Sequence, residues 1–242
     1  MIHPAPSASR TGDPAVSSLS AVPYFAGLSQ KVLETIASRC RPRIVSTGQL
    51  LFIEGDPCQD LCILVSGRVQ FFRMNAEGRE QILKVFERPG DTFCIASAFG
   101  TERHIVSAKA TTKTRLHLLD LAAVKKLIRQ YPEIGLKLVT TAGEHMTHLV
   151  ALADDLALKT VASRLAKHLD ELAAMQAAGN HEGSLLPRAR LREEELAALL
   201  GTVRVHISRS LRDLARAGAI EVNRRFIKIR DPAVLRQIAR GK

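Results

Sequence analysis

The stretch that most constrains the fold of this chain is EEELAALLGTVRVHISRSLRDLAR, at residues 193–216. Gly201 divides it into two short segments, and each segment has apolar residues at helical spacing. Two short helices joined by a turn that contains glycine are typical of a helix-turn-helix motif. We therefore predict such a motif over Glu193–Arg216, with its second helix placed to enter the major groove of DNA.

The second predicted helix has an apolar side and a basic side. A helical wheel places on the apolar side Val203, Ile207, Leu211 and Leu214. The N-terminal half of a recognition helix is the part that contacts base edges. The residues that we expect to read bases are Arg204, Val205, Ser208 and Arg209. The residues that we expect to contact phosphate are Thr202, His206, Arg212, Arg225 and Lys228.

The residue types suit these roles. The arginine fork of Arg209 matches O6 and N7 of guanine, a contact that provides about 1–3 kcal/mol of discrimination. The Ser208 hydroxyl can donate or accept, and Val205 can contact a thymine methyl group. The alternative for each arginine, Arg216 included, is a solvated helix face.

The charge of the chain favours an anionic partner. Among 242 residues, 35 Lys and Arg exceed 24 Asp and Glu, for a net charge of +11. Residues 186–242 carry 14 of these basic residues and 6 of the acidic ones. Such a concentration indicates binding to nucleic acid or to an anionic membrane surface.

The segment between Arg41 and Leu119 has a different pattern. Short β-rich runs alternate with glycines, and turn signals such as Gly55-Asp56-Pro57 recur about every 8–12 residues. This spacing predicts an antiparallel sandwich or barrel. The expected class is therefore α+β, with the helices before and after the strands.

A long helix is predicted from Glu133 to Leu158, because no proline interrupts this segment. A narrow, mostly apolar stripe whose members are three or four residues apart resembles a coiled-coil seam. We expect it to form a dimer interface through Leu138, His145, Leu149, Leu152 and Leu156. Packing of the stripe against its own domain is the alternative.

Beyond the predicted recognition helix, Ile220–Val222 and Phe226–Ile229 flank Asn223-Arg224-Arg225 and predict a short hairpin. A hairpin at this place makes the motif a winged helix-turn-helix.

These motifs, taken in order, resemble the cyclic-AMP receptor/fumarate-nitrate regulator (CRP/FNR) family over about residues 25–229. The resemblance rests on Gly55-Asp56, the segment ILVSG at 63–67, Glu77-Gly78-Arg79-Glu80, Pro89-Gly90-Asp91, VASRLA at 161–166 and Leu199-Leu200-Gly201 followed by Ile207-Ser208-Arg209. It implies a β-roll sensor, a dimerisation helix and a winged helix-turn-helix that binds a palindromic promoter. Residues 1–22 are rich in Ser, Pro and Ala without periodicity and are expected to be a disordered tail. The β-roll (23–131), the dimerisation helix (132–158) and the DNA-binding domain (159–242) would follow.

Two departures from the family pattern are informative. Val205 stands where many members have a glutamate, so the carboxylate that would accept from cytosine N4 is missing. In the sensor, nucleotide-binding members have a Gly-Glu pair and an Arg-Ser or Arg-Thr pair. The matching segment here is Phe93–Phe99 followed by His104, and Arg103 is shifted. We therefore do not expect cyclic AMP to be the ligand.

The sequence does not identify the signal that the β-roll would sense. Cys40, Cys58, Cys62 and Cys94 all lie in the sensor half, as candidates for a redox switch or an iron–sulfur cluster. Ordinary packing of small apolar side chains is the alternative. Residues 1–39 contain no cysteine, so the ligand pattern of oxygen-sensing members does not transfer. Haem is a further possibility, with ligands among His104, His117, His145 and His148, and the identity of any metal stays unknown.

No apolar run is long enough to span a membrane, and the N-terminus lacks the pattern of a secretory signal. We expect a cytoplasmic homodimer that binds promoter DNA, with RNA polymerase as a protein partner. A ligand-binding module whose basic C-terminus has another role is the competing reading. A third is an enzyme, which no Ser/His/Asp grouping, phosphate-binding glycine loop or metal triad in the sequence supports.

Overall fold

The computed structural model describes residues 19, 20, 22, 25, 27–178, 185–188 and 191–241. The expected tail at residues 1–18 lies outside this part. Two residues from the end of that expected tail, Leu19 and Val22, are fully buried in a hydrophobic core. The packed part of the chain therefore begins earlier than residue 23.

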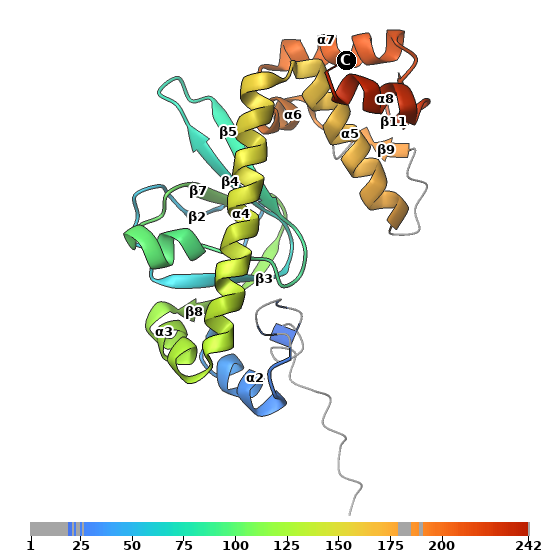
Figure 1. The fold of residues 1–242 in the computed structure, drawn as a ribbon. Coiled ribbons are helices and arrows are strands. Elements are labelled where there is room, and N and C mark those ends of the chain that lie inside the picture. Colours follow the sequence, from blue (N-terminus) through green and yellow to red (C-terminus); the bar gives the residue numbers. More distant parts are fainter. Residues whose placement is uncertain are drawn as a thin grey trace, which may run out of the picture. The chain divides into compact units, whose positions relative to one another are not determined.

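The described residues form two compact units. One contains the described residues up to Phe71 together with Val85–His145, and the other contains Phe72–Lys84 with Met146–Lys242. Figure 1 shows the elements of each unit, coloured along the sequence.

Two four-stranded sheets form a β domain, which belongs to the first unit apart from Phe72–Lys84. One has the order β1-β8-β3-β6 and the other β2-β7-β4-β5. The strands are β1 (Cys40–Val45), β2 (Leu50–Phe52), β3 (Asp60–Ser66), β4 (Val69–Met74), β5 (Glu80–Phe86), β6 (Thr92–Phe93), β7 (Ser107–Ala110) and β8 (Thr114–Asp120). Within the first sheet, β3 pairs antiparallel with both β6 and β8. This confirms the predicted antiparallel β domain, and its core lies between the inward faces of the strands.

Three helical elements accompany these sheets. They are α2 (Gln30–Ala37), the π-helical turn η2 (Ser97–Thr101) and α3 (Leu121–Gln130). The side chain of Asp120 caps α3, because its Oδ1 accepts hydrogen bonds from the amides of Ala122 (2.9 Å) and Ala123 (3.1 Å).

The long helix α4 runs from Pro132 to Leu158. Proline is favoured at the first position of a helix, where its missing N–H has no intrahelical partner anyway. The predicted dimer interface is partly wrong, because Leu138 is buried in the core of its own unit instead of facing a second chain. His145 packs edge-on against Phe86 of the same unit, with ring centroids 5.9 Å apart. Periodicity alone could not tell a stripe that faces its own domain from one that faces a second chain.

A second stripe on α4 remains exposed. Its members follow heptad spacing of three and four residues, and we call them the outer stripe: Leu136, Val139, Gly143, Met146, Val150, Ala153 and Ala157. The side chains of Leu136 and Val139 are 72% and 70% exposed. Of the residues predicted for the interface, Leu149 and Leu156 are also exposed and Leu152 is half-buried.

The second unit contains a small helical domain with a three-stranded sheet of order β10-β11-β9. Its elements are α5 (Val161–Ala178), β9 (Leu185–Pro187), α6 (Glu193–Leu199), α7 (Arg204–Arg216), β10 (Ile220–Val222), β11 (Phe226–Ile229) and α8 (Pro232–Ala239). A separate core, with Leu165 and Leu169 of α5 fully buried, holds these elements together. The predicted helix-turn-helix and hairpin are both confirmed; α8 was not predicted.

Among the described residues, no helix is both long and apolar enough to cross a membrane.

Candidate nucleic-acid interface and cysteine cluster

Helix α7 has the two faces that its sequence predicted. Ile207, Leu211 and Leu214 are buried in the core of the domain. Val203 is an exception, since 43% of it is exposed. The helix begins one residue later, and Val203 has an extended backbone (φ −114°, ψ 154°), so it does not follow the helical wheel.

The residues predicted to read bases lie on the opposite face. Arg204, Val205 and Arg209 are exposed, and Ser208 is half-buried beside them. Val205 is an apolar residue that is 64% exposed at the start of a helix with a basic face, so solvent or a partner can reach it. All four residues fall in the first half of α7, the part that reaches base edges in helix-turn-helix proteins.

The turn before α7 depends on Gly201. This residue has φ +62°, the left-handed conformation that costs other residues about 1–2 kcal/mol. Thr202 follows, and its side chain is buried and hydrogen bonded to Nδ1 of His206 at 3.1 Å. This burial argues against the predicted phosphate contact of Thr202. The Thr202 hydroxyl instead fixes the ring of His206, which is exposed.

The other residues predicted to contact phosphate are accessible. Arg212 is exposed, and its Nε donates to the carbonyl oxygen of Ser208 at 3.3 Å. Arg225 is exposed in the hairpin turn, where the side chain of Asn223 accepts its backbone N–H at 2.8 Å. Lys228 is half-buried on β11. The hairpin thus presents basic groups from a turn that is fixed by Asn223.

Glu193, the first residue of α6, organises the basic face of α7. Its Oε2 accepts a hydrogen bond from the Ser208 hydroxyl at 2.6 Å and one from Nε of Arg204 at 3.3 Å. Its Oε1 lies 3.3 Å from Arg188. The hydrogen bond from Ser208, helped by the two arginines, lowers the pKa of the Glu193 carboxyl group. The sequence reading missed Glu193, because its contacts join residues 15 positions apart.

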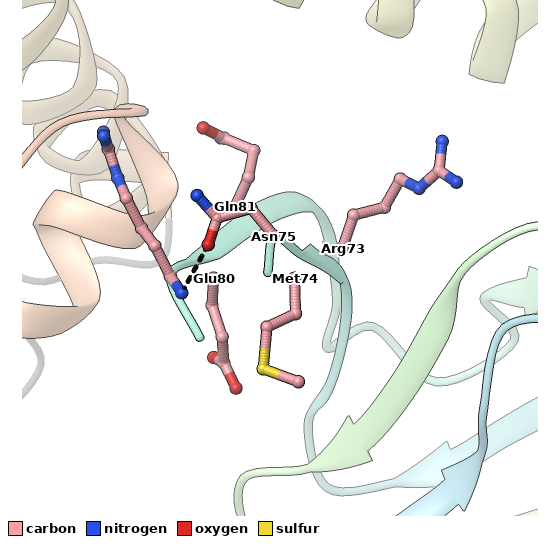
Figure 2. Close-up of a pocket in the computed structure, with 6 residues that line it drawn as sticks. Arg73, Met74, Asn75, Glu80 and Gln81 are labelled. Atoms are coloured by element: carbon pink, nitrogen blue, oxygen red, sulfur yellow. Dashed lines mark hydrogen bonds between the residues drawn. The ribbon is translucent and has the colours of Figure 1, made fainter. Parts of the chain in front are cut away.

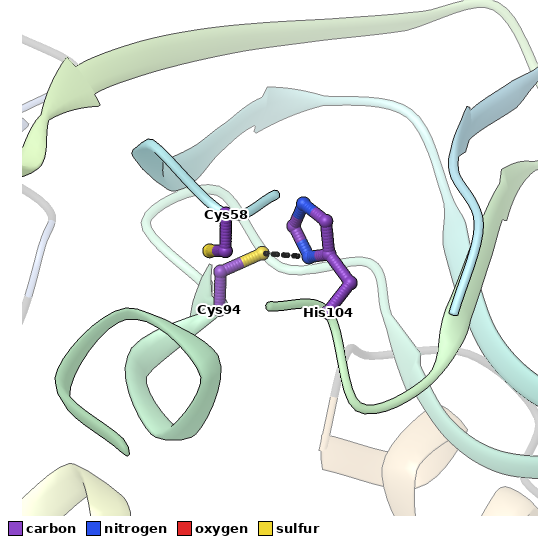
Figure 3. A group of neighbouring side chains, drawn as sticks. All are labelled: Cys58, Cys94 and His104. Atoms are coloured by element: carbon purple, nitrogen blue, oxygen red, sulfur yellow. Dashed lines mark hydrogen bonds between the residues drawn. The ribbon is translucent and has the colours of Figure 1, made fainter. Parts of the chain in front are cut away.

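In the β domain, three of the candidate signal residues converge in the core. Cys58 precedes β3, Cys94 directly follows β6, and His104 lies between η2 and β7. Their ligand atoms, two sulfurs and one ring nitrogen, are all within 4.8 Å of one another, and Figure 3 shows the three side chains side by side. Nδ1 of His104 is 3.8 Å from Sγ of Cys94. We call Cys58, Cys94 and His104 the thiol–imidazole cluster.

The cluster is buried, and its members influence one another. A hydrogen bond from Cys94, together with His104, lowers the pKa of the Cys58 thiol to about 5. Burial raises the pKa of Cys94 well above its usual value. Cys94 also has φ +74°, a conformation that costs a non-glycine residue about 1–3 kcal/mol and concentrates at functional sites.

The other two cysteines take different places. Cys62 lies on β3 opposite Phe93 of β6, and its thiol interacts with that of Cys94. Cys40 lies on β1 opposite Leu119 and does not belong to the cluster, and burial raises its pKa to about 11. The four cysteines therefore do not converge as a four-thiolate iron–sulfur site would require. His104 lies with Cys58 and Cys94 instead, a grouping that sequence spacing did not reveal.

The tip of the β4–β5 hairpin forms an open hollow of about 270 Å³, shown in Figure 2. It is lined by Arg73, Met74, Asn75, Arg79, Glu80 and Gln81. Oδ1 of Asn75 accepts the backbone N–H of Arg79 at 2.8 Å, which fixes the turn. Ligand pockets are mostly apolar and enclosed, so this polar hollow is a property of the turn rather than a ligand site.

Comparisons with known proteins agree with this architecture. Residues 42–131 match the model of the cyclic nucleotide-binding domain, and residues 163–238 match that of the Crp-like helix-turn-helix domain. A CRP-like cAMP-activated global transcriptional regulator of Mycobacterium tuberculosis (strain ATCC 25618 / H37Rv) is 30% identical over 217 residues, which cover 89% of this chain and 96% of that protein. The cyclic AMP receptor protein of Thermus thermophilus is 29% identical over 90% of this chain and 97% of that protein.

The solved structure of FixK2 from Bradyrhizobium japonicum has the same fold. It superimposes with a TM-score of 0.69 at 20% identity, over 82% of this chain and 96% of that one. The two family models and the full-length relatives fit the β domain, the winged helix-turn-helix and the exposed basic face of α7. The chain therefore belongs to the CRP/FNR family of DNA-binding transcription regulators.

Proposed function

We propose that this regulator acts as a homodimer that binds a palindromic promoter site, under the control of a signal received in the β domain. The observation that carries the proposal is helix α7, with Arg204, Val205 and Arg209 exposed on one face and a buried core on the other. A single helix of this kind reads only a few base pairs, and two-fold pairs of such modules read palindromes.

The outer stripe of α4 supports dimerisation. Its apolar members recur every three and four residues, which is the pattern of a two-stranded coiled coil. Met146 and Val150 are 63% and 54% exposed. A second copy of the same stripe is the occupant that matches this pattern, because a two-fold pair of helices places identical positions together.

The signal that we propose is not cyclic AMP, although two relatives carry that nucleotide in their names. The segment Phe93–Phe99 lacks a Gly-Glu pair, so no carboxylate stands where the family holds the ribose. The charged residues that follow it are engaged in other contacts. Arg103 donates to the carbonyl oxygen of Gly55 at 2.8 Å, and Glu102 pairs with Lys125 at 3.3 Å.

RNA polymerase is the protein partner that we propose at the promoter, because the family consists of transcription regulators. The rest of the proposal concerns DNA alone and is tested without polymerase.

The test is selection of bound sequences from random double-stranded DNA by the full-length protein, followed by affinity measurements at several salt concentrations. We expect a palindrome with one guanine per half-site read by Arg209, and a different base from the family consensus beside it, opposite Val205. The affinity for this site should fall steeply with salt, as it does for proteins that contact many phosphates. Selection of unrelated sequences without two-fold symmetry would contradict the proposal.

A further inference from the structure

The geometry points to a binding site for a single thiophilic cation of the Zn²⁺ class in the core of the β domain, with Cys58, Cys94 and His104 as ligands and Cys62 in the fourth position. The binding itself is independent of the proposed function. Only its effect on DNA rests on that function.

The ligand atoms are already gathered. In a tetrahedral site with Zn–S near 2.3 Å and Zn–N near 2.0 Å, neighbouring ligand atoms are separated by roughly 3.3–3.8 Å. The two sulfurs and Nδ1 of the thiol–imidazole cluster lie within 4.8 Å of one another. Small side-chain rotations would therefore close the site, whereas a multi-iron cluster needs ligands that are spread around a larger body.

The histidine is held in place before any ion arrives. The ring of His104 stacks on Phe52, with centroids 3.6 Å apart and an angle of 5° between the planes. Its backbone N–H donates to the carbonyl oxygen of Asp56 at 2.8 Å, and its carbonyl oxygen accepts from Gly55 at 2.8 Å. Such contacts fix the direction in which Nδ1 points, as the outer partners of metal-bound histidines do.

We assign the fourth position to Cys62, a buried thiol that lies outside the thiol–imidazole cluster itself. It is on β3, one strand away from the position of Cys94 after β6, and its thiol interacts with that of Cys94. Cys₃His is one of the common ligand sets of structural zinc. Thiolates and imidazole together select Zn²⁺ and softer ions over Mg²⁺ or Ca²⁺, which prefer oxygen.

The burial of the cluster favours a resident ion over a reactive thiol. Cys58, Cys94 and His104 are 3%, 5% and 8% exposed, whereas redox-sensing cysteines are characteristically accessible to oxidant. The left-handed backbone of Cys94 turns the chain directly after β6. An ion at this point would join the start of segment Phe93–Phe99 to the loop before β3 and to the loop that carries His104.

The experiment is a titration of the reduced, chelator-treated full-length protein with Co²⁺ in the absence of air, followed by addition of Zn²⁺. We expect one Co²⁺ per chain, with thiolate-to-cobalt charge-transfer absorption and tetrahedral d–d bands that Zn²⁺ abolishes. Cys58→Ser, Cys94→Ser and His104→Ala should each weaken Co²⁺ binding by more than about tenfold. Loss of a partner that only supports a ligand already costs at least about tenfold, and these residues are direct ligands. Cys40→Ser is the matched control and should bind as the parent does.

Circular dichroism spectra and thermal melting of each variant separate loss of ligand from loss of fold. If a variant does not fold, Cys62→Ser provides the test, because removal of one thiolate should shift the charge-transfer intensity while an ion still binds. Absence of a stoichiometric cobalt spectrum in the reduced parent would overturn the proposal. So would unchanged binding in His104→Ala, or recovery of a Cys58–Cys94 disulfide from a protein that takes up no ion after reduction.

DNA affinity of the metal-free and metal-loaded protein is measured separately, with the selected palindrome. We expect a difference between the two forms. If the ion binds and the affinity is unchanged, the link to regulation fails and the metal site stands. If neither form binds DNA specifically, the proposed function fails, and the cobalt titration still decides the metal site.

Discussion

The winged helix-turn-helix and the β domain place their candidate functional groups in opposite environments. On α7, Arg204 and Arg209 are exposed to solvent on a face that continues along one helix. In the β domain, Cys58, Cys94 and His104 come from three separate segments and are buried. A surface of charges suits a large anionic partner that arrives from outside, whereas a closed set of soft ligands suits a small ion.

The largest effect is expected from a change that separates the two copies of α7 in the proposed dimer. Val150→Glu places a charge in the outer stripe, and we expect the dimer to dissociate because two facing carboxylates would be desolvated and repel each other. Affinity for the full palindrome should fall by about 10²–10⁴-fold, as expected when linked binding events are separated. Sedimentation and fluorescence anisotropy measure the two effects.

Ala151→Glu is the control for this change, since Ala151 is also exposed on α4 but lies outside the outer stripe. A Val150→Glu protein that remains dimeric and binds the palindrome normally would show that the outer stripe has another role.

A smaller effect is expected from single arginines of α7. Arg209→Ala should weaken binding to the selected site by about 5- to 150-fold, corresponding to the 1–3 kcal/mol of a bidentate guanine contact, and relax the preference at one base pair. Arg212→Ala should instead weaken binding to all sequences similarly and reduce the salt slope by about one. Anisotropy with matched and mutated sites distinguishes the two, and equal behaviour of both variants would contradict the assigned roles.

A substitution in the turn between α6 and α7 should lower the stability of the protein moderately. Gly201→Ala forces a side chain into a backbone with φ +62°, at a cost of about 1–2 kcal/mol. The melting temperature should fall by about 2–8 °C for a chain of this size. Gly100→Ala is the control, because it has no positive φ and an added Cβ would meet nothing within 4 Å. An equal shift in both variants would mean that the turn is not the cause.

The smallest expected effect is that of cyclic AMP, which we predict to leave both DNA affinity and melting temperature unchanged. The reason is that Phe93–Phe99 lacks the acidic residue for the ribose, while Arg103 is bonded to Gly55. Calorimetry with the nucleotide checks this directly. Saturable binding with a tightened DNA complex would show instead that the β domain recognises the nucleotide with other residues.

Most features that depend on residues close together in the sequence were predicted, and features that depend on residues far apart were not. Helices α4 and α7, the β-rich segment between Arg41 and Leu119 and the hairpin after α7 follow local periodicity and turn residues, so their predicted places agree with the structure to within a few residues. Helix α8 was missed although Asp231 and Pro232 form a helix start signal and Val234, Leu235 and Ile238 share one face. The two-residue strand β6 is too short to show any periodic pattern.

The candidate sites divide in the same way. The basic face of α7 was predictable because all its members lie on one helix. The thiol–imidazole cluster was not, because the loop before β3 supplies Cys58 and the loop after η2 supplies His104, and these loops are far apart in the sequence. Leu138 was assigned to the wrong partner, since both stripes of α4 have coiled-coil spacing and only the packing of the β domain distinguishes them.

The contact between Glu193 and Ser208 has a consequence for which bases α7 can tolerate. As long as the Ser208 hydroxyl gives its proton to the Glu193 carboxylate at 2.6 Å, its oxygen offers only lone pairs to the groove. An oxygen of this kind accepts from the amino groups of adenine and cytosine and is repelled by the carbonyl groups of guanine and thymine. If Ser208 reads a base as we propose, a glutamate on the neighbouring helix would restore, through a serine, some of the amino-group preference that a glutamate at Val205 would have supplied.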